Sequence, residues 1–100
     1  MARAIPRWER LKPSVGESGA PGWRLVSADD AQQVAVYRKN EGPWKDATIF
    51  CEFRTRDWQW RFVMFDGQDR FVTQQYGEHY NEALDRLQQT LTDRNLPPLS

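Results

Sequence analysis

Few residues in this 100-residue chain could perform chemistry, and the single histidine, His79, is the first to consider. Glu78 and Glu82 lie within one helical turn of His79, and a histidine with a carboxylate three residues later can bind a metal ion. Two or three ligands on one helix leave such a site incomplete, and no second cluster in the sequence completes it. The pattern favours a solvent-exposed helix start, so we expect no bound metal.

Cys51 is the only cysteine, and it lies between Phe50 and Glu52 in a run of β-favourable residues. A thiol in the middle of a strand is most often a small buried apolar group. One cysteine forms neither an intramolecular disulfide nor a cysteine-based zinc site, which fits a reducing compartment. We expect a cytoplasmic protein in which Cys51 has no catalytic role.

Four further carboxylates stand in predicted turns, where such side chains favourably bond to the backbone. They are Asp29, Asp30, Asp66 and Asp69. The sequence contains no Gly-rich phosphate loop, nucleophile elbow or nucleotide-binding fingerprint. We therefore expect no enzymatic activity, no cofactor and no small-molecule ligand.

Tryptophan is unusually frequent, with five in 100 residues, and 11 of the 14 basic residues are arginine. Arginine binds carboxylates and phosphates bidentately, stacks on aromatic rings, and is enriched with Trp and Tyr at protein interfaces. The residues that we predict to contact a partner are Trp8, Tyr37, Trp44, Arg54, Arg56, Trp58, Trp60 and Arg61. In the alternative interpretation, the N-terminal segment and the Trp44 loop cover the surplus aromatic surface and complete the core.

Five β-favourable runs separated by turn residues predict an antiparallel sheet of about five strands, as two hairpins plus a connecting strand. The runs are residues 23–27, 33–38, 47–54, 58–65 and 70–74. Asp66-Gly67 is the clearest turn signal, because this pair supplies the positive-φ positions of tight hairpins. Alternation along the fourth run predicts one apolar face, formed by Trp58, Trp60, Phe62 and Met64.

The C-terminal part has helical periodicity. Apolar residues recur three, four, seven and eleven positions after Tyr80, which predicts an amphipathic helix over residues 78–93 that Pro97 and Pro98 terminate. One apolar stripe covers one sheet face, so we predict an α+β fold with the helix packed on one face of the sheet. The predicted organisation is a basic, proline-containing arm at 1–21, a single domain at 22–94 and a short tail at 95–100.

The 14 basic and 14 acidic residues balance, which argues against a mainly electrostatic nucleic-acid binder. No apolar run is long enough for a membrane span. We therefore expect a small non-catalytic binding domain that acts through protein–protein contacts on a sheet surface of aromatic residues and arginines, as a homodimer, an adaptor or an inhibitor.

The alternative function is nucleic-acid binding, in which sheet aromatics stack on bases and arginines contact phosphates. In its order of strands followed by a helix, about half of the chain resembles the arm-binding domains of phage-type integrases. That resemblance is one of topology and implies a sheet that enters a groove of DNA.

Overall fold

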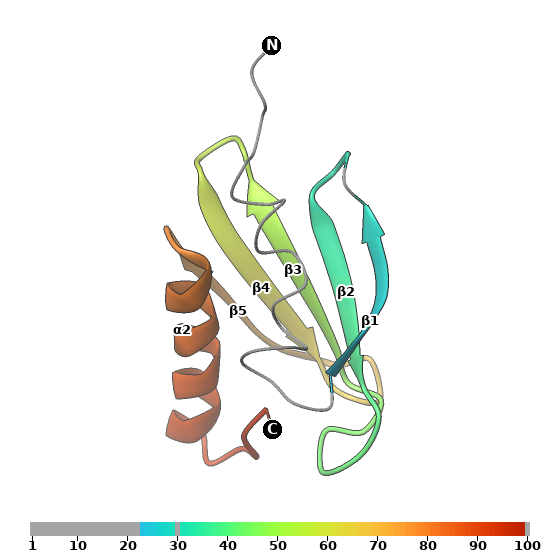
Figure 1. Cartoon of the computed structure of the whole chain (residues 1–100). Coiled ribbons are helices and arrows are strands. Elements are labelled where there is room, and N and C mark those ends of the chain that lie inside the picture. The colour runs from blue at the N-terminus through green and yellow to red at the C-terminus, as the bar shows by residue number, and fades with distance from the viewer. Residues whose placement is uncertain (1–22, 30, 100) are drawn as a thin grey trace.

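The computed structural model describes residues 23–29 and 31–99 and shows five strands followed by one helix (Figure 1). The predicted arm at 1–21, with Trp8, lies outside the described residues. The elements are β1 (Trp23–Asp29), β2 (Val34–Lys39), β3 (Thr48–Arg54), β4 (Gln59–Phe65), β5 (Phe71–Gly77) and α2 (Tyr80–Asp93). The predicted α+β fold is confirmed.

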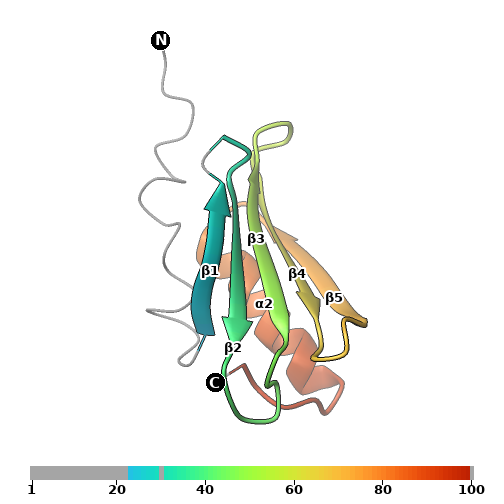
Figure 2. The ribbon, with the colours of Figure 1, turned by 90° about the vertical axis from the view of Figure 1, so that its right-hand side faces the viewer.

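The five strands form one antiparallel sheet in chain order, so each strand pairs with the strand before it. Both ribbon views place α2 on one side of this sheet (Figures 1 and 2), where it packs on β4 and β5. We call this side the inner face and the opposite side the outer face. Within the described ranges, no helix is long and apolar enough to cross a membrane.

The inner face carries the core, as alternation along β4 predicts. Trp60, Phe62 and Met64 point inward and are fully buried, whereas their neighbours on β4 are only partly buried. The ring of Tyr80, at the start of α2, meets Trp60 and Phe62 edge-on, with both centroid distances at 5.3 Å. Buried leucines at one face of α2, among them Leu87, complete the contact, and each contributes roughly 1.5–3 kcal/mol of transfer free energy.

The chain after α2 folds back onto the core. Asn95 adopts a left-handed conformation, and the backbone N–H of Leu96 donates to the carbonyl of Leu91, which is a Schellman-type helix end. The tail that follows accepts two indole hydrogen bonds, from Trp23 to the Leu99 carbonyl at 2.8 Å and from Trp44 to the Pro97 carbonyl at 2.7 Å. Both indoles are therefore buried against the tail.

Two details of the turns differ from the sequence prediction. Trp58 precedes β4 instead of belonging to it: it ends the β3–β4 turn with a positive φ of 56°, and its ring meets the buried Phe53 edge-on at 5.6 Å but stays 57% exposed. In the β4–β5 turn the positive φ belongs to Asp69, at 62°, and not to Gly67. Gly67 is needed for a different reason, because a Cβ there would lie 2.6 Å from the carbonyl oxygen of Lys45.

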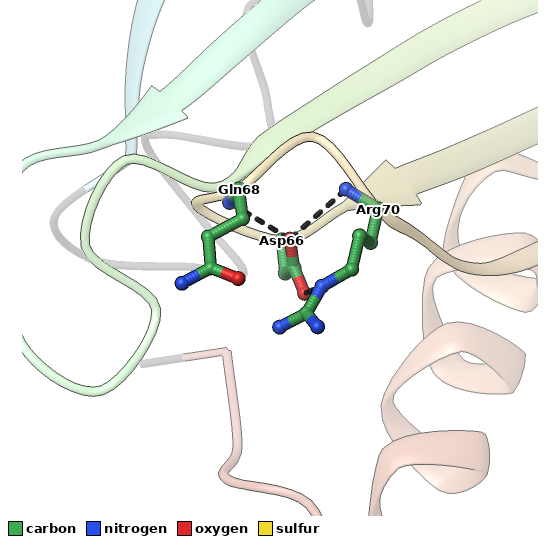
Figure 3. Close-up of polar contacts among 3 residues, drawn as sticks. All are labelled: Asp66, Gln68 and Arg70. Carbon is green, nitrogen blue, oxygen red and sulfur yellow. Dashed lines mark hydrogen bonds and ion pairs between the residues drawn. The ribbon is translucent and has the colours of Figure 1, made fainter.

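Asp66 fixes the β4–β5 turn through its carboxylate (Figure 3). Its Oδ1 accepts the backbone N–H of Gln68 at 2.8 Å and that of Arg70 at 3.0 Å, and its Oδ2 accepts the Arg70 Nε–H at 3.2 Å. The backbone bond from Arg70 and then that from Gln68 hold the pKa of Asp66 below its ordinary value. The turn aligns Phe65 with Phe71 across the two strands.

We predict that Gly77→Ala destabilises the fold by about 1–3 kcal/mol, because the new Cβ would lie 2.7 Å from the backbone nitrogen of Ala83 in α2. Gly42→Ala is the control: its position has open space but a φ of 83°, so it should cost only about 1 kcal/mol. Urea denaturation measures both. A Gly77→Ala loss no greater than that of Gly42→Ala would contradict the close approach of β5 and α2.

We also predict a pH-dependent contribution from Asp66. Because its pKa is lowered in the folded state, its stabilisation is fully present above the ordinary aspartate value of about 4 and is lost as the pH falls through the folded-state pKa. Wild type should therefore exceed Asp66→Asn in stability at pH 7, and the difference should shrink below about pH 4. Thermal unfolding over this pH range tests it, and a difference that is constant with pH refutes it.

Candidate interaction surface

The outer face of the sheet is a surface on which no described helix packs (Figure 2). It comprises the residues that alternate with the core positions. Those that shape its surface are Val34, Val36, Arg38, Phe50, Glu52, Arg54, Arg61, Val63, Phe65, Phe71, Gln74 and Tyr76. All of these residues are partly or fully exposed.

A row of three phenylalanines crosses the centre of this face. Phe50 on β3 meets Phe65 on β4 edge-on at 5.8 Å between ring centroids, and Phe65 meets Phe71 on β5 at 6.0 Å. We call Phe50, Phe65 and Phe71 the outer aromatic row. Phe71 is 59% exposed, although burying such a ring would contribute roughly 1.5–3 kcal/mol.

The outer aromatic row forms the floor of a shallow groove. One depression, of about 440 Å³, is lined by all three rings together with Val34 and Val63. A second, of about 320 Å³, is lined by Phe50 and Phe65 and continues to Val36 and Arg38. Because the two depressions share two rings, they form one apolar groove, which we call the outer groove.

Charged residues stand at the β3–β4 end of the outer groove, and most are compensated. Glu52 and Arg61 are cross-strand neighbours whose Oε1 and Nε atoms lie 2.8 Å apart. Arg54 donates to the hydroxyl of Tyr76 at 3.0 Å and lies 3.4 Å from the carboxylate of Asp57. Such partly exposed pairs contribute about 1 kcal/mol or less each, so their main effect is to cancel charge beside the groove.

A polar depression of about 490 Å³ adjoins this end. Arg54, Arg56 and Arg61 line it together with Glu52. Among the described residues, Arg56 has no ion-pair or hydrogen-bond partner, so its guanidinium is free to bind a carboxylate or a phosphate. Glu52 and Arg61 line both this depression and the outer groove, which makes the two continuous.

The structure separates the predicted contact residues into three groups. Arg54, Arg56 and Arg61 lie at the polar end of the outer face, and Trp58 is 57% exposed at the neighbouring turn. Three others lie in the core: Tyr37, Trp44 and Trp60. Trp8 is outside the described residues.

The outer aromatic row is not among the contact residues that the sequence predicts. Alternation places Phe50 and Phe65 on the mixed faces of their strands, beside Glu52 and Arg61, but it does not show that the rings meet. The signal that predicts this row is the register between neighbouring strands. The Asp66 turn places Phe65 opposite Phe71, and the pairing of Phe50 with Val63 puts Phe50 on the same face, two residues along from the position opposite Phe65.

Reactive groups do not gather in any part of the chain that the structure describes. Cys51 is fully buried, and burial, followed by the charge of Glu52, raises the pKa of its thiol far above the ordinary value, so no thiolate forms at neutral pH. Glu82 is paired with Arg86 at 2.9 Å and accepts the backbone N–H of Glu78. No group of three His, Cys, Asp or Glu residues within 23–29 and 31–99 could hold a metal ion.

Trp58 and Trp60 should respond differently to substitution. Trp60→Ala removes a fully buried ring and should cost about 3–5 kcal/mol, whereas Trp58→Ala should cost no more than about 1 kcal/mol. In acrylamide quenching, Trp58→Ala should remove more of the quenchable fluorescence than Trp60→Ala does. Equal losses of stability would contradict the placement of Trp58 outside the inner row.

Comparisons with protein-family models, with curated protein sequences and with solved structures give no match for this chain.

Proposed function

We propose that this chain is a non-catalytic protein-binding domain whose outer groove contacts its partner. One observation carries the proposal: a continuous apolar groove crosses a sheet face on which no described element packs. Contiguous exposed apolar surface on a soluble domain often marks an interaction site.

The composition of the groove supports a protein partner. Aromatic side chains and arginine are enriched at protein interfaces, and the strongest contributions come from central residues that become fully desolvated. Phe65 lies between Phe50 and Phe71, so a partner that covers Phe71 also excludes water from Phe65. We expect these two rings to contribute most to affinity.

The charges beside the groove also favour protein over nucleic acid. Arg61 is paired with Glu52, and Arg54 is paired with Asp57. A nucleic-acid backbone bound at the β3–β4 end of the groove would therefore meet carboxylates as well as guanidinium groups. Nucleic-acid affinity comes largely from phosphate neutralisation, which a balanced surface supplies weakly. A mixed surface instead suits a polypeptide that presents both signs of charge.

Nucleic-acid binding is the second candidate, because Phe71 and Tyr76 are on the same face as Arg56 and Arg54. Exposed rings on an antiparallel sheet can stack on unpaired bases. This function requires affinity for single-stranded oligonucleotides that falls steeply with salt.

To test the proposed function, peptides that bind the full chain are first selected from a random display library. The affinity of these peptides is then measured for wild type, Phe65→Ser and Phe71→Ser. Both changes should weaken binding at least tenfold, because they remove apolar contact area from the centre of the groove. Leu25→Ser is the matched control, since Leu25 is an exposed apolar residue of β1 that does not line the groove, and it should leave affinity unchanged.

The same chains are titrated with single-stranded oligonucleotides at low and high salt. The proposal predicts that any oligonucleotide binding is the same in wild type, Phe65→Ser and Phe71→Ser. Peptides that bind Phe71→Ser as tightly as wild type, or salt-dependent oligonucleotide binding that Phe71→Ser removes, would overturn it.

A further inference from the structure

β1 is the terminal strand of the sheet, and its far edge pairs with no described strand. Every side chain from Arg24 to Asp29 is exposed, and Leu25 and Val26 remain 47% and 45% exposed. An edge with apolar side chains and unpaired backbone groups is a template for pairing with another strand.

A bulge in β1 determines which of its side chains share a face. The pairing of β1 with β2 shifts by one residue between Leu25 and Ser27. Arg24 is opposite Arg38 and Asp29 is opposite Val34, so both charged residues of the β1 edge lie on the outer face. Leu25 and Ala28, opposite Tyr37 and Ala35, both lie on the inner face.

The outer face carries an uncompensated pair of like charges at this edge. Arg24 and Arg38 are directly opposite each other, and no described carboxylate pairs with either. Like charges in facing cross-strand positions are destabilising. A carboxylate brought to the free side of Arg24 would relieve this repulsion.

We propose that β1 pairs antiparallel with β1 of a second copy of this chain, with Arg24 of each copy opposite Asp29 of the other. This register also places Leu25 opposite Ala28, so inner-face residues meet inner-face residues. A slip by one residue would oppose inner-face to outer-face side chains and lose both charge pairs.

Asp29 is able to make this contact without leaving its own turn. Its Oδ1 accepts the backbone N–H groups of Ala31 and Gln32 at 3.0 and 3.1 Å, and its Oδ2 has no such bond in the described chain. The two-fold symmetry of the pairing produces the Arg24–Asp29 contact twice. It also joins two sheets edge to edge, so that their outer grooves lie on one continuous face.

This pairing does not depend on the proposed function, because it uses the β1 edge and not the outer groove. Phe71→Ser should therefore leave self-association unchanged while it weakens peptide binding. The two ideas can fail separately.

Sedimentation equilibrium of the full chain over a wide concentration range should show a mass that rises from monomer towards dimer. Arg24→Asp should raise the dimer dissociation constant at least tenfold, because two attractive pairs become two repulsive ones. Arg94→Asp is the matched control: it makes the same charge change at an exposed arginine that contacts β5, at the opposite edge of the sheet from β1, and should leave the dissociation constant unchanged. Circular dichroism verifies that both variants are folded.

Cross-linking determines the register independently. The native Cys51 is fully buried, so introduced thiols react selectively. An equimolar mixture of Leu25→Cys and Ala28→Cys chains, treated with the shortest bifunctional thiol reagent, should give several times more dimer than either variant alone. When both copies carry the same variant, their two introduced thiols are offset by about three positions along the strands, or roughly 10 Å. The shortest reagent therefore links them poorly.

A monomer mass at every concentration at low salt would overturn the proposal. So would equal weakening by Arg24→Asp and Arg94→Asp, or cross-linking of Leu25→Cys alone as efficient as that of the mixture.

Discussion

The contact between α2 and the inner face is the constraint on which the rest of the structure depends. Tyr80 places its ring against Trp60 and Phe62, and the leucine face of α2 continues this contact along β4 and β5. A sheet has two faces, and the single helix that the structure describes buries one of them. Among the described residues, the outer aromatic row is therefore left without a covering element, and the far edge of β1 pairs with no strand.

Much of the fold could be predicted because it follows from local periodicity. Alternation along β4 separates Trp60 and Phe62 from Arg61 and Val63, and the spacing of the α2 leucines defines its buried face. Trp58 could not be placed in this way: alternation assigns it to the inner row, but the four-residue turn that connects β3 to β4 takes it out of the strand. The role of Gly67 depends on its approach to Lys45, a contact between separate loops that no local pattern encodes.

The candidate surface was predicted less completely. Arg54 and Arg61 are predicted as contact residues because they cluster in the sequence around Trp58 and Trp60, and both line a depression of the outer face. The outer aromatic row depends on which residues face one another across strands, and turn geometry sets that register. Trp44 could not be assigned from sequence either, because its burial depends on a hydrogen bond to the Pro97 carbonyl, 53 residues away along the chain.

The central claim is that one sheet face is core and the other is open for binding. The chain has five phenylalanines, and fluorine NMR of fluorophenylalanine-labelled protein with a soluble paramagnetic probe observes all of them at once. We predict strong broadening for Phe71, weaker broadening for Phe50 and Phe65, and none for the buried Phe53 and Phe62. A Phe71 resonance as protected from the probe as that of Phe62 would contradict the claim.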